Sequence, residues 1–273
     1  MIQCGKPSEY YRFLDSDKEI EFMRYDMPTP WMNYLSNGML HAMISHAGGG
    51  VAFYKSPQIW RINHYRFFHL PTDRSGFYTY IKDGGEVWCP TGMPVKTQPE
   101  RWKSIHGLGY TRFEAERKGL KAQALYFIGS RENSMIWNLK LTSDCDREIA
   151  VYPFVELGMM EFMRELQWQC YNKHQLKVSY MEEEQALVYR YGVENQPRPD
   201  ETPLIYFAAT EPVLSFEGDR DEFIGPYRSE EEPAGVLEDT LGNSVLWGGD
   251  PCFAFQIPVK LKAGEEKEIS IFL

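Results

Sequence analysis

The chain has 273 residues, of which 43% are hydrophobic and 25% are charged. This balance is typical of a globular protein with a large core, and it excludes a disordered, collagen-like or coiled-coil chain. Because 29 Lys and Arg stand against 39 Asp and Glu, the net charge is −10, which would repel a nucleic-acid backbone. We therefore expect no nucleic-acid partner, and we expect a single β domain over residues 1–273.

The sequence also lacks signals for a membrane or an oxidising compartment. No apolar run approaches the roughly 18 residues that cross a bilayer, and residues 1–6 do not resemble the start of a signal peptide. The five cysteines are odd in number and far apart, which favours reduced thiols over a disulfide framework or a zinc site. We expect a soluble, cytoplasmic protein with no membrane contact.

Alternating hydrophobicity predicts strands along most of the chain. In chain order they cover residues 39–46, 51–55, 77–82, 110–116, 120–128, 135–141, 148–157, 174–181, 185–191, 203–209, 253–260 and 266–273. Residues 117–119 form a short glycine-containing connection of the kind that closes a hairpin. Many strands with short turns predict a mostly β protein with a large antiparallel sandwich.

Three segments depart from this alternation. Helical spacing of apolar residues predicts a helix or ordered crossover over 159–170, with one face made by Met159, Phe162, Met163, Leu166 and Cys170. Three prolines predict a rigid loop over 194–203, and residues 217–251 are expected to form a long surface excursion. The last residues, 266–273, are an apolar strand without a polar tail, so we expect the chain to be a domain of a longer polypeptide.

Local motifs for catalysis or metal binding are weak. His41 and His46 are five residues apart, as are His64 and His69, and an odd spacing in a strand sends the two rings to opposite faces. We expect structural or surface roles for the histidines and no metal site. Gly48–Gly50 precedes a strand-like run instead of a helix, which indicates a tight turn or close backbone approach.

The run Asp219-Arg220-Asp221-Glu222 leaves two interpretations open. Its carboxylates would suit glycosidic chemistry if one acid had a raised pKa and the other stayed ionised. The neighbouring arginine favours a structural ion-pair clasp, because a nearby cation lowers the pKa of a carboxyl group.

Six runs in order carry a resemblance to a known family. They are residues 28–35, 47–54, 61–73, 88–90, 106–111 and 218–227. Together they resemble the amino-terminal domain of the cellobiose and chitobiose phosphorylases, glycoside hydrolase family 94, over residues 28–273. The resemblance implies a galactose-mutarotase-like supersandwich, followed in the full protein by a helical linker, an (α/α)6 barrel and a small carboxy-terminal β domain.

The resemblance also implies a reaction and a division of labour. In this family one barrel aspartate protonates the glycosidic oxygen while inorganic phosphate, the co-substrate, attacks with inversion to give an α-sugar 1-phosphate. An inverting hydrolase needs a second carboxylate to activate water, whereas phosphate is already a nucleophile. The sandwich then supplies scaffold, contacts of a homodimer and part of the acceptor-sugar site. We expect no cofactor, and we expect no catalytic residue within this chain.

The candidate substrate-binding residues follow from the same resemblance. Family members bring a stretch after Val-Glu-Phe to the active site, and the corresponding region here contains Glu161, Gln167, Trp168 and Gln169. Trp168 and Gln169 match the family's aromatic residue and glutamine, whereas Met160 replaces a tryptophan and Cys170 an arginine, so cellobiose specificity is not implied. Trp168 either stacks on a sugar ring or packs inward.

Three functions remain open at this point. The preferred interpretation is the amino-terminal sandwich of an inverting β-glycoside phosphorylase acting on a disaccharide or oligosaccharide, inactive without the catalytic barrel of the same polypeptide. An alternative is a free-standing carbohydrate-binding or oligomerisation module. The third is a mutarotase-like enzyme, which would need a histidine base paired with a glutamate acid.

Overall fold

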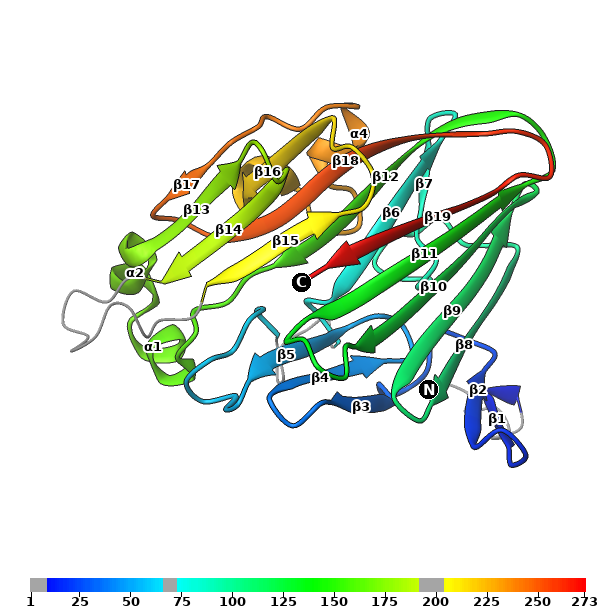
Figure 1. The fold of residues 1–273 in the computed structure, drawn as a ribbon, viewed down its shortest axis with the longest axis horizontal. Coiled ribbons are helices and arrows are strands. Elements are labelled where there is room, and N and C mark those ends of the chain that lie inside the picture. Colours follow the sequence, from blue (N-terminus) through cyan, green and yellow to red (C-terminus); the bar gives the residue numbers. More distant parts are fainter. Residues whose placement is uncertain (1–8, 66–72, 192–203) are drawn as a thin grey trace.

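The computed structural model describes residues 9–65, 73–191 and 204–273, and antiparallel strands dominate it (Figure 1). One sheet has eleven strands. In spatial order they are β1 (Tyr11–Leu14), β2 (Glu19–Phe22), β8 (Arg101–Gly107), β9 (Tyr110–Arg117), β10 (Leu120–Ile128), β11 (Met135–Ser143), β19 (Glu266–Phe272), β15 (Ile205–Ala209), β14 (Ala186–Tyr191), β13 (Leu176–Met181) and β17 (Leu246–Trp247).

Two smaller sheets and several short helices complete the described part. The five-stranded sheet contains β16 (Ser215–Asp219), β18 (Pro251–Leu261), β12 (Arg147–Glu156), β6 (Phe77–Asp83) and β7 (Glu86–Trp88), in that order. The three-stranded sheet contains β3 (Met32–Ser36), β4 (Leu40–Ser45) and β5 (Gly50–Tyr54). The helices are α1 (Phe162–Gln167), α2 (Gln169–Asn172), the 3₁₀ turn η2 (Lys173–Gln175), α3 (Arg220–Ile224) and α4 (Ala234–Leu237).

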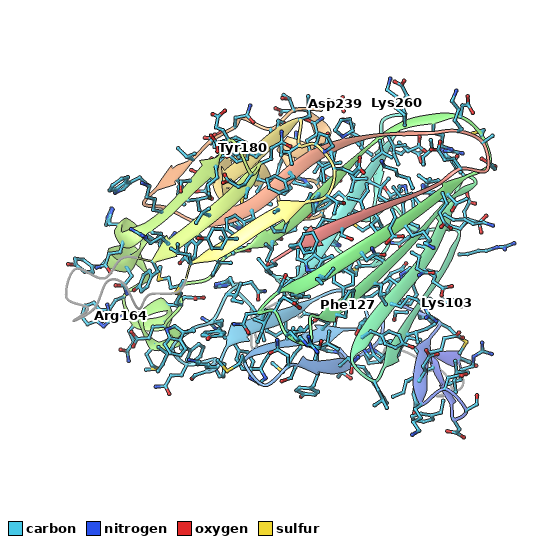
Figure 2. The ribbon with its side chains drawn as sticks, in the orientation of Figure 1. Lys103, Phe127, Arg164, Tyr180, Asp239 and Lys260 are labelled. Carbon is cyan, nitrogen blue, oxygen red and sulfur yellow. The ribbon has the colours of Figure 1, made fainter. Side chains whose placement is uncertain are left out.

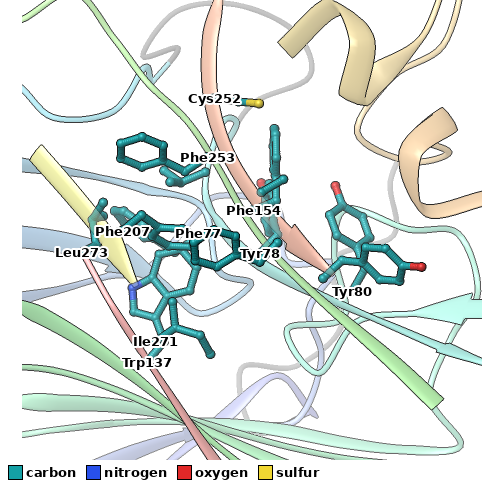
Figure 3. Close-up of a cluster of buried hydrophobic side chains, with 14 of the residues drawn as sticks. Phe77, Tyr78, Tyr80, Trp137, Phe154, Phe207, Cys252, Phe253, Ile271 and Leu273 are labelled. Atoms are coloured by element: carbon teal, nitrogen blue, oxygen red, sulfur yellow. The ribbon is translucent and has the colours of Figure 1, made fainter. Parts of the chain in front are cut away.

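Aromatic side chains fill the space between the two larger sheets (Figure 3). Phe207 on β15 lies with its ring centroid 5.4 Å from that of Phe253 on β18, and Trp137 on β11 lies 5.7 Å from Phe77 on β6. Such ring pairs add to the hydrophobic stabilisation from their burial. These contacts join one sheet to the other, so the predicted antiparallel sandwich is confirmed.

Each predicted strand overlaps an observed strand, whereas seven short or polar strands were not predicted. They are β1, β2, β3, β7, β8, β16 and β17. In β8 the buried positions include Ser104 and His106, so the polar sequence hides the alternation. The imidazole of His106 is hydrogen-bonded to the Thr111 hydroxyl at 3.1 Å, which makes its burial tolerable.

The predicted turns are confirmed in detail. Lys118 and Gly119 both have positive φ, 46° and 77°, as a two-residue hairpin turn requires, and they join β9 to β10. At Gly49 a side chain would overlap the backbone of Asp73. The glycine run therefore serves close backbone approach. The loop predicted over 194–203 lies outside the described residues.

The prediction of a surface excursion over 217–251 is wrong. Strand β12 is buried on both faces along its second half, so its outer face needs a covering layer. The segment supplies that layer: Phe223 of α3 stacks on Phe154 of β12 with ring centroids 4.4 Å apart, and Val236 of α4 is fully buried. Short irregular elements have no regular periodicity, so the burial of their apolar residues cannot be predicted from spacing.

Candidate functional site

The candidate substrate-binding residues lie at the corner between α1 and α2. Glu161 is the N-cap residue of α1, Gln167 is its last residue, and Trp168 is its C-cap residue. All three line one open pocket of about 570 Å³, together with Met163, Arg164, Tyr171 and Asn172. Gln169 begins α2 directly beside them. Figure 2 shows Arg164 at this end of the molecule, far from Lys103 at the other end.

Two aromatic side chains give the pocket a broad exposed surface. Trp168 is 65% exposed and Tyr171 is 63% exposed, so Trp168 does not pack inward. The backbone explains its position: at φ −131° Trp168 leaves the helical conformation and ends α1, while its carbonyl accepts the N–H of Asn172 at 2.9 Å. Exposed aromatic rings of this kind are suited to stacking on an amphipathic ligand.

Polar groups surround these rings. The Arg164 guanidinium and the Glu161 carboxylate pair at 2.5 Å, one turn apart on α1. The side-chain amide of Asn172, which is buried, donates to the carbonyl of Arg164 at 3.1 Å and ties α2 to α1. The arrangement offers hydrogen-bonding groups next to flat apolar faces.

The helical prediction over 159–170 is correct in type but wrong about the face that it buries. The chain forms two short helices broken at Trp168, and the apolar side chains of Met163 and Leu166 are 41% and 62% exposed. A charged residue, Glu165, instead faces inward and is only 7% exposed. The spacing of apolar residues does not predict this orientation of the helix, because the ion pair of Glu165 outweighs the preference of apolar side chains for the interior.

A buried ion cluster holds Glu165. Its carboxylate pairs with the Arg61 guanidinium at 2.6 Å and contacts the imidazole Nδ1 of His64. Burial alone would raise the pKa of Glu165, but the hydrogen bonds and charges of His64 and Arg61 outweigh burial and lower that pKa. The third function that the sequence left open would use a histidine base and a glutamate acid, and the lowered pKa does not favour Glu165 as such an acid.

Two other histidines have structural surroundings. His41 stacks on Phe53 with ring centroids 4.9 Å apart, and the buried ring of His46 accepts the backbone N–H of Trp31 at 3.2 Å. Within residues 9–65, 73–191 and 204–273, no three His, Cys, Asp or Glu side chains form a group that could hold a metal ion. Residue 69 is outside those ranges. Cys89, Cys145, Cys170 and Cys252 are free thiols.

The run at 219–222 has partners that the sequence did not reveal. Arg220 lies 3.1 Å from Glu156 on β12 and 3.0 Å from Glu230, whereas Asp221 is 3.9 Å away. The Asp219 side chain accepts the N–H of Asp221 at 2.9 Å and caps α3. Burial raises the pKa of Asp219, so the expectation that Arg220 lowers it is wrong. The contacts join segments that are distant in sequence, as a structural role requires.

The described strands define a β-supersandwich domain. The family described as "Glycosyl hydrolase 94, supersandwich domain" matches residues 18–273, and the chain belongs to this family. Among the helices that the structure describes, none has the length and apolar character needed to span a lipid bilayer.

Relatives of known activity are longer proteins. The N,N′-diacetylchitobiose phosphorylase of Vibrio proteolyticus is 31% identical over 274 residues, which cover 96% of this chain and 33% of that protein. The solabiose phosphorylase of Paenibacillus borealis is 30% identical, with 93% of this chain and 33% of that protein covered. The chain thus spans about a third of the length of these relatives.

A solved structure shows the same fold. A candidate kojibiose phosphorylase from the human microbiome superimposes with a TM-score of 0.52 at 12% identity, covering 98% of this chain and 33% of that chain. At such low identity the likeness concerns the fold alone.

Proposed function

We propose that this chain is the amino-terminal domain of an inverting β-glycoside phosphorylase, and that its α1–α2 corner forms one wall of the acceptor-sugar site. The observation that carries the proposal is the exposed aromatic pair on that corner, in a chain of the family 94 supersandwich type. The phosphorylase activities of the relatives in Vibrio and Paenibacillus support the reaction class.

The proposal assigns a limited role to these residues. Trp168 and Tyr171 stack on a sugar ring, while Glu161, Gln167 and Gln169 hydrogen-bond its hydroxyl groups. The proton donor and the phosphate pocket belong to a catalytic barrel of the same polypeptide. Because phosphate needs no activating base, this wall has only to bind and orient the saccharide. The proposal includes a cytoplasmic homodimer without a cofactor.

A substitution tests the saccharide wall. In the complete gene product, Trp168→Ala should raise the Michaelis constant for the acceptor sugar about three- to tenfold, the equivalent of losing one aromatic contact, and leave that for phosphate unchanged. Trp247→Ala is a matched control, because Trp247 is 78% exposed but lies on β17, outside the pocket. An unchanged acceptor constant in Trp168→Ala would contradict the proposal.

The reaction class has its own test. Phosphate release or consumption is measured with the complete protein on a panel of β-linked disaccharides and α-sugar 1-phosphates. Turnover of one disaccharide, or of one α-sugar 1-phosphate, identifies the substrate. Failure of every compound would favour a different assignment, such as a free-standing carbohydrate-binding module. Cleavage of a disaccharide by residues 1–273 alone would instead contradict the assignment of the proton donor to a separate catalytic barrel.

A further inference from the structure

We infer that Glu165 is a positioning residue, which fixes the rotation of α1 and thereby presents the α1–α2 pocket to the saccharide. The inference rests on the proposed function, because it concerns the same pocket. Glu165 does not line that pocket, so the role is an indirect one.

One carboxylate joins three segments of the chain. An oxygen of Glu165 accepts from the Arg61 guanidinium at 2.6 Å and from the backbone N–H of Met159 at 3.0 Å. The other oxygen contacts His64. Arg61 is 3% exposed, so this pair lies away from water, where removing one partner is costly.

Backbone contacts fix the same region. The N–H of Phe162 donates to the carbonyl of Gln58 at 2.9 Å, and the N–H of Arg61 donates to the carbonyl of Met160 at 3.0 Å. The guanidinium of Arg61 also lies 4.8 Å from the centroid of the Phe162 ring. The segment after β5 therefore holds the start of α1 through hydrogen bonds as well as through charge.

The consequence is the orientation of α1. An amphipathic helix normally turns its apolar stripe to the core, yet Met163 and Leu166 point outward while Glu165 points inward. Six residues make only about two turns, too short to hold an orientation without tertiary contacts. Arg61 and His64 hold the carboxylate of Glu165 on the inner side of α1. For this reason the side chains of Arg164 and Trp168 lie toward the pocket.

The test separates positioning from stability. In the complete protein, Glu165→Gln should raise the acceptor Michaelis constant three- to tenfold, as Trp168→Ala does, and leave the phosphate constant unchanged. Hydrogen exchange should become faster in peptides covering residues 159–172. Glu148→Gln is the control, because Glu148 pairs with Lys260 on the exposed surface.

A second variant covers the case in which Glu165→Gln fails to fold. The double substitution Arg61→Met with Glu165→Leu replaces the ion pair by apolar groups, which often preserves stability. A folded double variant that binds acceptor more weakly supports the inference. Normal acceptor binding by either folded variant, with Trp168→Ala still impaired, overturns the positioning role alone. If Trp168→Ala is also unimpaired, the saccharide wall itself is refuted.

Discussion

Arg220→Ala is expected to destabilise the domain strongly, because the arginine balances two buried carboxylates. Its side chain is 17% exposed, and those of Glu156 and Glu230 are 9% and 4% exposed. Removing one partner of a buried ion pair typically costs about 3–5 kcal/mol, a large share of the roughly 5–15 kcal/mol by which a folded protein is stable. The exposed pair of Lys260 and Glu148 provides the contrast, at about 0–1 kcal/mol.

Urea unfolding at pH 7 of Arg220→Ala and of Lys260→Ala measures the two costs. Adding Glu156→Gln and Glu230→Gln to Arg220→Ala should recover part of the loss, since the charges that the arginine balanced are then absent. Equal costs for Arg220→Ala and Lys260→Ala would refute the reasoning. A normally folded Arg220→Ala enzyme that has lost turnover would refute the structural role.

Two further predictions concern the core and a turn. Burial lowers the pKa of His106 to about 4, so its stabilising contribution is complete above the unfolded value near 6.5 and is lost as pH falls through 4. Between pH 7 and pH 4, the free energy of unfolding in urea should therefore fall by about 3 kcal/mol more for the unaltered protein than for His106→Asn. Equal decreases in the two proteins would contradict the prediction. Gly49→Ala should cost about 1–3 kcal/mol by overlap with Asp73, whereas Gly129→Ala should cost much less, because its tightest neighbour is the flexible carboxylate end of Glu132. Similar urea midpoints for the two alanine variants would argue against that overlap.

The sandwich could be predicted because its strands alternate cleanly. In β10 the buried and less buried positions alternate from Leu120 to Tyr126, and the following strand, β11, repeats the pattern from Met135 to Leu141. Alternation with a period of two indicates a strand, whereas β8 buries the polar residues Ser104 and His106, and His106 gains its partner Thr111 only after folding. Local pattern therefore identifies strands whose inner face is apolar and misses those whose inner face is polar.

The pocket could be predicted only in part, for the same reason. The sequence placed Trp168 near a helix end, but its exposure depends on which side of α1 faces the sandwich. That choice is made by Arg61 and His64, about a hundred residues earlier in the chain, which draw Glu165 inward. A hydrophobic-moment argument sees only the residues of the helix itself and gives the reverse orientation. The exposed apolar side chains of α1 thus accompany long-range charge pairing, and in the same arrangement Trp168 is exposed.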